Sequence, residues 1–171
     1  MTRRFPILLA TTVLAVFAAD AGTSATPRLC AGRDLHGSFT VIRGSAGAGS
    51  ISYRLRLANR STGVCFVTGL PVVGLLDIHG KRLPTHVRPS TPGAGTAVIV
   101  RLEPGDMTTA TARFSPDVPG PGEPTAGRKC EPTAYKLRVG ARGGGATVVS
   151  IRPATPVCEH GSMSWSLYGR A

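Results

Sequence analysis

The chain has 171 residues, of which 42% are hydrophobic and only 5% aromatic, and its 20 Lys and Arg residues outnumber its 9 Asp and Glu residues. This length suits a single domain with a substantial core, and the longest apolar run, 5–19, is shorter than the ~20 residues that a membrane-spanning helix needs. The net charge of +11 favours anionic partners such as envelope polymers, acidic lipid headgroups or nucleic acid.

The N-terminal segment has the pattern of a secretory signal peptide. Arg3 and Arg4 precede the apolar run, and Ala19-Asp20-Ala21 has the small residues of a cleavage site. We therefore predict a signal peptide over residues 1–21, cleaved near Ala21 or at a second candidate site near Ala25, and a single domain over residues 22–171. Cleavage after Ala21 leaves 18 Lys and Arg against 8 Asp and Glu. We expect a secreted protein of the extracellular space or cell envelope that does not span the membrane once the signal is removed.

Strand-like alternation dominates the rest of the chain. Polar and apolar residues alternate over 50–57, 135–139 and 162–167, which places one face in a core and the other in water. Further strands are expected at 35–42, 65–68, 72–78, 97–102, 108–114 and 147–151. No convincing amphipathic helix follows residue 21. The pattern is typical of antiparallel sheets, so we predict an all-β sandwich of about eight or nine strands.

Two long segments rich in Pro and Gly are expected to be loops, at 88–96 and 115–128. Proline lacks the amide hydrogen that a strand ladder needs and favours extended conformations. Each loop is either a connection between sheets or a recognition loop, because long ordered loops often carry function.

The four cysteines allow three disulfide pairings. Sequential pairing would join Cys30 to Cys65 and Cys130 to Cys158, whereas an immunoglobulin-like bridge between sheets would join Cys65 to Cys130 or Cys158. The cysteines are widely spaced and form no C-x₂₋₄-C pair, which argues against a metal site. In an exported chain we expect two disulfides, no metal and no other cofactor.

Candidate catalytic groups are sparse. The histidines are His36, His79, His86 and His160, and no G-x-S-x-G element marks a nucleophile. Asp77 and His79 would share a strand face, but the segment up to Gly80 is more typical of a hairpin turn. The carboxylates lie mostly beside Pro or Gly in expected turns, which is unfavourable for a facing pair in a cleft. The sequence therefore predicts a protein without enzymatic activity.

Five cations on the outward phase of the expected strands form a candidate face for an anionic partner. They are Arg54, Arg56, Arg113, Lys136 and Arg138. The face exists only if these strands are neighbours in one sheet. The alternative is compositional: only three cations are lysines, and a GC-rich genome encodes abundant Arg without selection for a partner. Nucleic acid is not expected as a partner, because most aromatic residues fall on the apolar phase of strands, away from a stacking surface.

The order of cysteines and Gly/Pro landmarks resembles a secreted actinobacterial family called domain of unknown function 4232, over residues 30–168. The landmarks are Cys30, Leu57-Ala58-Asn59, Cys65, Gly69-Leu70-Pro71, Leu75-Leu76-Asp77, Gly80, residues 100–105, Cys130-Glu131-Pro132 and Cys158. The resemblance implies an immunoglobulin-like β-sandwich, two sequentially paired disulfides, an envelope or extracellular location and no catalytic residues. The chain departs from the pattern in having Leu70 in place of an aromatic residue and in the Pro-rich spacer before Cys130.

Three functions remain open on these grounds. The first is a binding module that recognises an anionic envelope polymer or lipid headgroups through the basic strand face. The second is a structural or assembly domain that pairs with an extracellular partner protein through an edge strand or loop. The third is a hydrolase with an unrecognised site.

Overall fold

A computed structural model describes residues 28–93, 98–125 and 129–171. The predicted signal peptide and both cleavage sites lie outside these residues. In the described part the chain forms twelve strands and two short helical turns. The strands are β1 (Arg28–Leu29), β2 (Leu35–Val41), β3 (Ile51–Asn59), β4 (Cys65–Thr68), β5 (Val72–Leu76), β6 (His86–Pro89), β7 (Ile99–Leu102), β8 (Met107–Phe114), β9 (Ala134–Gly140), β10 (Ala146–Thr155), β11 (Ser162–Trp165) and β12 (Gly169–Arg170). The turns are η1 (Gly32–Asp34) and α1 (Cys158–Gly161).

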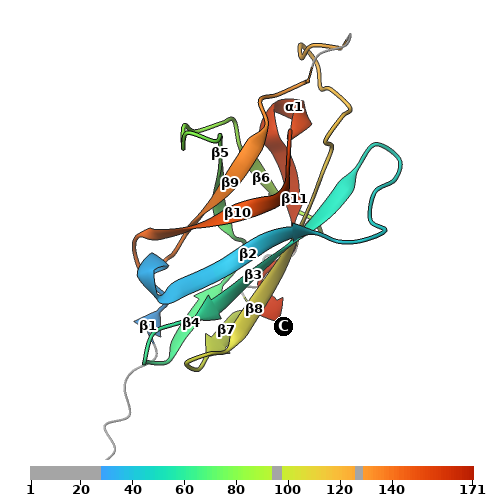
Figure 1. Ribbon diagram of the computed structural model, residues 1–171. Coiled ribbons are helices and arrows are strands. Elements are labelled where there is room, and N and C mark those ends of the chain that lie inside the picture. Colours follow the sequence, from blue (N-terminus) through green and yellow to red (C-terminus); the bar gives the residue numbers. More distant parts are fainter. Residues whose placement is uncertain (1–27, 94–97, 126–128) are drawn as a thin grey trace, which may run out of the picture.

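The strands form two sheets, so the predicted all-β class is confirmed (Figure 1). The large sheet has the order β5-β9-β10-β2-β3-β8-β11-β6, and β12 pairs with β8. The small sheet has the order β1-β4-β7. Buried residues of β4 and β7, including Val67 and Leu102, belong to the same core cluster as the inner residues of the large sheet. The small sheet therefore packs against the large one.

The large sheet curves until its two ends approach each other. Leu83, just before β6, donates its amide to the carbonyl of Leu75 on β5 at 2.9 Å, and the Leu75 amide donates to Oγ1 of Thr85 at 2.9 Å. The segment leading into β6 thus bonds to β5, at the opposite end of the strand order. The sheet is nearly closed and barrel-like, with its inner side chains enclosed.

Stacked aromatic rings occupy the centre of this enclosure. The ring centroids of Phe39 on β2 and Trp165 on β11 lie 5.5 Å apart with planes 19° from parallel. Tyr53 and Phe114 continue the cluster, and all four residues are buried. Burial of each large side chain stabilises the fold by about 1.5–3 kcal/mol, and each favourable ring pair adds ~1 kcal/mol. The alternation expected over 50–57 is confirmed here, because Tyr53 and Leu55 point inward.

The expectation of purely antiparallel sheets is wrong at three strand pairs. β10 pairs with β2, β11 with β6, and β1 with β4 in parallel. Alternation along a strand reports which side chains are buried, and it carries no information on the direction of a partner far away in sequence. Two expected boundaries also differ from the structure. Residues 86–89 form the edge strand β6, although a loop was expected from residue 88, and β10 continues past the expected end at Ile151 to Thr155.

Both disulfides have the sequential pairing implied by the family resemblance, and the bridge from Cys65 to Cys130 or Cys158 is not formed. The Cys30–Cys65 sulfur atoms lie 2.06 Å apart and the Cys130–Cys158 sulfur atoms 1.87 Å apart. The first links β4 to the residue after β1, and the second links the segment before β9 to α1. Each closed loop stabilises the fold by roughly 3.5–4 kcal/mol in the chain-entropy description.

Paired cysteines are typical of proteins that mature in an oxidising environment. Among the described residues, no helix is both long and apolar enough to cross a membrane.

Candidate functional site

Three of the five predicted cations lie together on the outer side of the large sheet. β3 and β8 are antiparallel neighbours, with Arg54 opposite Thr111 and Ser52 opposite Arg113. The intervening residues of both strands, such as Tyr53 and Ala112, are buried. Arg54, Arg56 and Arg113 therefore project from adjacent strands into solvent.

The other two predicted cations lie farther along the same outer side. Lys136 and Arg138 are on β9, which β10 and β2 separate from β3. Neighbouring strands are about 4.8 Å apart, so three strand steps place these side chains roughly 14 Å or more from Arg54 along the sheet. The Lys136 ammonium also donates to the carbonyl of Ile78 at 3.3 Å. The predicted five-residue face is thus divided into two groups.

Two arginines that the sequence reasoning missed each lie two strands away from one member of the first group, Arg152 from Arg54 and Arg88 from Arg113. Arg152 on β10 lies opposite Thr40 of β2, and Arg88 on β6 lies opposite Ser164 of β11; both arginines are exposed. Arg88 was hidden in a segment expected to be a loop because of its prolines, and Arg152 came just after the expected end of a strand. We call Arg54, Arg56, Arg88, Arg113 and Arg152 the basic face; because the sheet is nearly closed, this face winds round its outer surface, with Arg152 on β10 and Arg88 on β6 at opposite ends, five strands apart in the sheet order.

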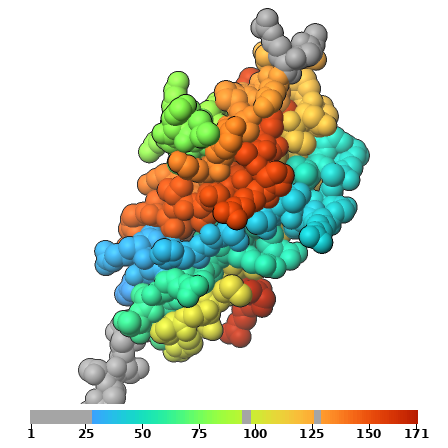
Figure 2. All heavy atoms as spheres, viewed as in Figure 1, coloured from blue at the N-terminus to red at the C-terminus, as the bar shows by residue number. Residues whose placement is uncertain are grey.

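The strands that carry the basic face contain no carboxylate. The sequences of β10, β2, β3, β8, β11 and β6 include no Asp or Glu. Three of these strands, β10, β2 and β3, lie side by side in Figure 1, and Figure 2 shows the surface that β10 and β2 present. Within the described ranges, the only carboxylate within 4 Å of a basic-face guanidinium is Glu159, 3.8 Å from Arg88. Positive charge on the outer surface of these strands is therefore largely unneutralised by the described part of the protein.

Small hydroxylated residues surround these arginines. The outward positions between them are occupied by Ser38, Thr40, Ser52, Thr109, Thr111 and Ser164. The core aromatics of the same strands point to the opposite side, into the enclosure. Hydroxyl and guanidinium groups suit a hydrated, hydrogen-bonding anionic ligand.

A groove crosses one end of the basic face. It has a volume of about 340 Å³, and its walls include Arg88, Arg113, Ser50 and Val118. Arg113 donates from Nε and Nη2 to Oγ of Ser50 at 2.9 and 2.8 Å, and Arg88 donates from Nε to Oγ of Ser164 at 2.9 Å. Both guanidiniums are thereby oriented by serine hydroxyls.

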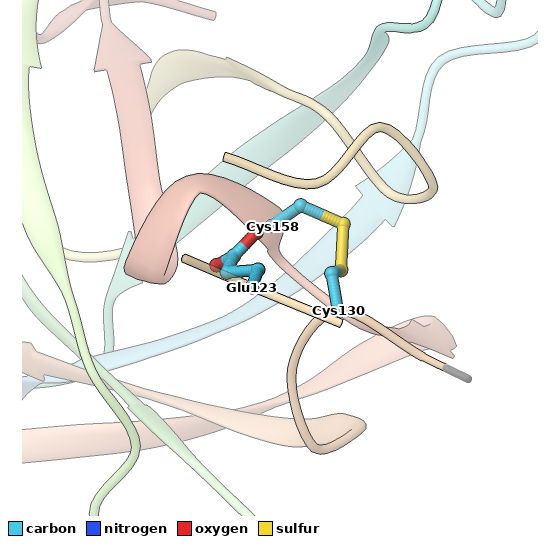
Figure 3. Close-up of side chains that lie close together, drawn as sticks. All are labelled: Glu123, Cys130 and Cys158. Atoms are coloured by element: carbon cyan, nitrogen blue, oxygen red, sulfur yellow. A yellow bond between two sulfur atoms is a disulfide. The ribbon is translucent and has the colours of Figure 1, made fainter. Parts of the chain in front are cut away.

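A buried carboxylate forms the second notable cluster. Glu123, from the Pro-rich segment, has a side chain only 1% exposed. Its Oε2 accepts the amides of Gly120 at 2.6 Å and Glu159 at 2.9 Å, and its Oε1 accepts the amide of His160. Figure 3 shows this carboxylate beside the disulfide of Cys130 and Cys158.

The same contacts determine the ionisation of Glu123. Burial raises the pKa of its carboxyl, but the amide hydrogen bonds from His160, Gly120 and Glu159 lower it more, and the nearby imidazole of His160 lowers it further. The net pKa of Glu123 lies below its usual value, so the group is a carboxylate near neutral pH.

Left-handed backbone brings these amides to the carboxylate. Glu159 and His160 have φ values of 54° and 56°, and Gly161 follows at 77°. Side chains disfavour this conformation by ~1 kcal/mol or more per residue, so the turn needs compensation. The Glu123 carboxylate supplies it by accepting two of the turn's amides. The cluster is therefore best described as an anchor that fixes the Pro-rich segment to α1.

Metal binding at this cluster lacks support. Glu123, Glu131 and His160 lie close enough together for their side-chain atoms to approach one ion. However, both Glu123 oxygens already accept amide hydrogens, and the adjacent cysteines are joined in a disulfide and offer no thiolate.

The histidine and aspartate considered for catalysis lie in a turn. Oδ1 of Asp77 accepts the amides of His79 and Lys81 at 2.9 and 2.8 Å. This is the pattern of an Asx turn, in which the carboxylate closes the hairpin between β5 and Arg82. The expected turn over 77–80 is confirmed.

Residues 30–166 match the model of a protein family described as Domain of unknown function (DUF4232). No curated protein and no solved structure gives a significant match to the chain.

Proposed function

The chain belongs to this family of domains of unknown function, whose description assigns no activity, and we propose from its geometry that it is a secreted, non-enzymatic binding domain whose basic face holds an anionic polymer. The observation that carries the proposal is the set of six adjacent strands that bear five outward arginines and no carboxylate. Such a surface raises the local concentration of polyanions and binds them in a manner sensitive to salt.

Secretion is the first element of the proposal. It is supported by the signal-like segment at 1–21 and by the two disulfides, which persist outside the cytosol. Expression of the full chain in a suitable bacterial host should yield protein in the medium or envelope fraction that begins near residue 22 or 26. Retention of residues 1–21 on a cytosolic protein would contradict it.

An immunoglobulin-like arrangement is the second element. Phe39 and Trp165 are three strands apart in the sheet order, yet their rings stack, which supports a sheet folded over on itself like the two layers of a sandwich. A crystal structure whose strand order cannot be superposed on any immunoglobulin-like domain would contradict this assignment.

A polymer fits the basic face better than a membrane or a nucleic acid. Proteins that bind membrane surfaces insert exposed apolar groups beside their cations, and single-strand binders stack bases on aromatic rings. The residues between Arg54, Arg56 and Arg113 are instead hydroxylated, and the aromatic rings of these strands are buried. The favoured partner is a hydrated polyanion of the envelope or extracellular space.

Binding measurements test this proposal directly. The mature domain is titrated with polyanions at low ionic strength, and we expect affinity to fall as salt is added. Replacement of Arg54, Arg56 and Arg152 by Gln should weaken binding strongly. The matched control replaces the exposed Arg33, Lys81 and Lys129, which removes the same charge away from the face. Equal losses in both triple variants would show that net charge alone is responsible and would overturn the proposal.

One observation favours a second candidate, an assembly domain. β7 is the outer strand of the small sheet, and Ile99 on it is 67% exposed beside the exposed Val98. An outer strand with exposed apolar residues can accept a strand from a partner protein. Co-purification of a stoichiometric protein from culture medium, lost on replacement of Ile99 by Lys, would support this function in place of polymer binding.

A further inference from the structure

We propose that the groove between Arg88 and Arg113 is a specific site for a phosphodiester group, and that the polymer recognised by the basic face is a phosphodiester-linked polyol. This inference deepens the proposed function and rests on it. It concerns one built site within the basic face, so it can fail while the wider surface still binds polyanions.

The strand register places the two arginines on opposite sides of one serine. Ser164 of β11 lies opposite Arg113 of β8 and also opposite Arg88 of β6. Strand spacing then separates the two arginine backbones by about 10 Å. Both side chains line the same groove, Arg88 with its guanidinium on Ser164 and Arg113 with its guanidinium turned toward Ser50, just before β3.

A serine hydroxyl accepts a hydrogen bond from the Nε edge of each guanidinium. The Nε atoms of Arg88 and Arg113 are engaged by Ser164 and Ser50, which leaves Nη1 hydrogens of each arginine directed elsewhere. Fixed guanidiniums lose less side-chain entropy when a ligand binds. The site is therefore arranged to donate hydrogen bonds from two separate directions.

Two donors from opposite walls suit a tetrahedral anion better than a planar one. A carboxylate presents its acceptor sites in one plane, whereas the oxygens of a phosphate group diverge from a tetrahedral phosphorus, so that guanidiniums on different walls can each bind one. The groove volume of about 340 Å³ is at the lower end of small-ligand sites and leaves room for polyol on either side of the phosphate. Ser162 and Ser164 supply hydroxyl partners for such a polyol.

The groove wall is held in place by contact between two loops. Gly49, at a φ of 70°, faces the Val118 side chain so closely that a Cβ on Gly49 would collide with it. The loop before β3 therefore packs on the Pro-rich segment, whose other end is anchored through Glu123. A groove between such fixed loops is preformed.

Glu159 acts as an internal competitor for the ligand. Its carboxylate lies 3.8 Å from Nη2 of Arg88, and its side chain is 43% exposed. A phosphate that enters the groove replaces this weak ion pair and experiences repulsion from Glu159. Removal of the Glu159 charge should therefore strengthen binding, in the opposite direction to removal of either arginine.

The test uses glycerophosphoglycerol, a soluble phosphodiester flanked by two polyols, with the full mature domain at low ionic strength. Titration calorimetry and amide chemical shifts measure affinity and location. The double variant R88Q/R113Q should bind about tenfold or more weakly, as expected for loss of charge-assisted hydrogen bonds. R88K/R113K should recover only part of the affinity, and E159Q should bind about two- to fivefold more tightly. R33Q/K81Q serves as the charge-matched control and should bind like the wild type.

Further experiments distinguish a soluble polymer from a membrane as the source of the phosphodiester. They also distinguish failure of the groove proposal from failure of the basic-face proposal. Soluble poly(glycerol phosphate) should bind, and vesicles of phosphatidylglycerol in phosphatidylcholine should not compete with it. Stronger binding to the vesicles would contradict the polymer proposal and identify a membrane surface as the partner. If R54Q/R56Q/R152Q loses polymer binding while R88Q/R113Q does not, the groove inference is overturned and the basic face stands. If no variant changes binding, both are overturned. Circular dichroism and thermal unfolding confirm that each variant is folded.

Discussion

Nδ1 of His160 lies 3.6 Å from Oε1 of Glu123, although the two residues are 37 positions apart in the chain. The contact joins the Pro-rich segment to the left-handed turn at α1, and Glu131 approaches the same imidazole nitrogen at 3.4 Å. An exposed histidine thus sits over a fully buried carboxylate, and the anchor that shapes one wall of the groove depends on ionisable groups.

Replacement of Glu123 by Gln should destabilise the domain markedly. The amide side chain keeps one oxygen but presents an NH₂ group to backbone amides that need acceptors, so we expect a loss of about 2–3 kcal/mol in the free energy of unfolding. Urea denaturation of the purified domain measures it. Glu103→Gln is the control, because Glu103 is exposed and forms a surface ion pair with the exposed Arg101, and such pairs contribute ~0–1 kcal/mol. Similar losses in the two variants would refute the anchoring role.

The stability of the domain should depend on pH on the acid side. Glu123 has a lowered pKa in the folded state, and the hydrogen bond from Arg28 likewise lowers the pKa of Asp34. A group of this kind contributes its full stabilisation above its unfolded pKa of about 4, and the contribution disappears as pH falls through the folded value. Urea midpoints measured below pH ~5 should therefore decline, and Glu123→Gln should decline less steeply than the wild type. An unchanged slope in this variant would contradict the prediction.

The alkaline side should show a separate dependence on His160. Its hydrogen bond with the Pro121 carbonyl raises the pKa of His160, partial burial opposes the rise, and the charges of Glu123 and Glu131 add to it. A raised pKa stabilises the fold fully below the unfolded value of about 6.5, and the stabilisation is lost as pH rises through the folded value. His160→Gln should abolish this decline in stability while leaving the acid-side decline in place. Direct titration of the imidazole by NMR provides the matching measurement, and a pKa at or below 6.5 would exclude the mechanism.

Gly161 should be intolerant of any side chain. It adopts a φ of 77°, and a Cβ at this position would collide with the backbone carbonyl of Pro84, just before β6. Gly161→Ala should therefore cost about 2 kcal/mol or more, because both the left-handed conformation and the approach of two backbones are disturbed. Gly169→Ala is the control, since its Cβ would meet open space. Thermal unfolding compares the two, and equal midpoints would show that the α1 turn can shift away from Pro84.

The disulfides should contribute independently. Cys30→Ser with Cys65→Ser, and Cys130→Ser with Cys158→Ser, should each lower the free energy of unfolding by roughly 3.5–4 kcal/mol. The second pair should also loosen the anchor at Glu123, which hydrogen exchange of the His160 amide would detect as faster exchange. Undiminished protection of this amide without the Cys130–Cys158 bridge would assign the rigidity of the turn to Glu123 alone.

Local patterns in the sequence predicted local features of the fold. Alternation identified β3, β9 and β11 because one face of each is buried, and the hairpin turn over 77–80 was predicted from its Gly and polar residues. The same reasoning could not find β6, whose four residues are all exposed and carry no periodic signal. Nor could it give strand directions, since β10 and β2 become neighbours only after the intervening chain has folded.

The candidate site was predictable only in part, for a related reason. Arg54, Arg56 and Arg113 were identified by their phase on recognisable strands, but their union with Arg88 and Arg152 depends on the sheet order. Glu123 stands between Gly122 and Pro124 and has the local features of a solvent-exposed turn residue. Its burial arises from amides supplied by a turn more than thirty residues later, which no local pattern reports.

The two sulfur bridges enclose stretches of chain, 30–65 and 130–158, that neither overlap nor nest. In a polypeptide that emerges from a membrane pore beginning with its N-terminus, the earlier ring can be sealed before any residue of the later one appears. A crossed connectivity would make Cys30 wait for Cys130, with Cys65 available meanwhile as a wrong partner. The order of the cysteines thus lets each bridge close without waiting for the other.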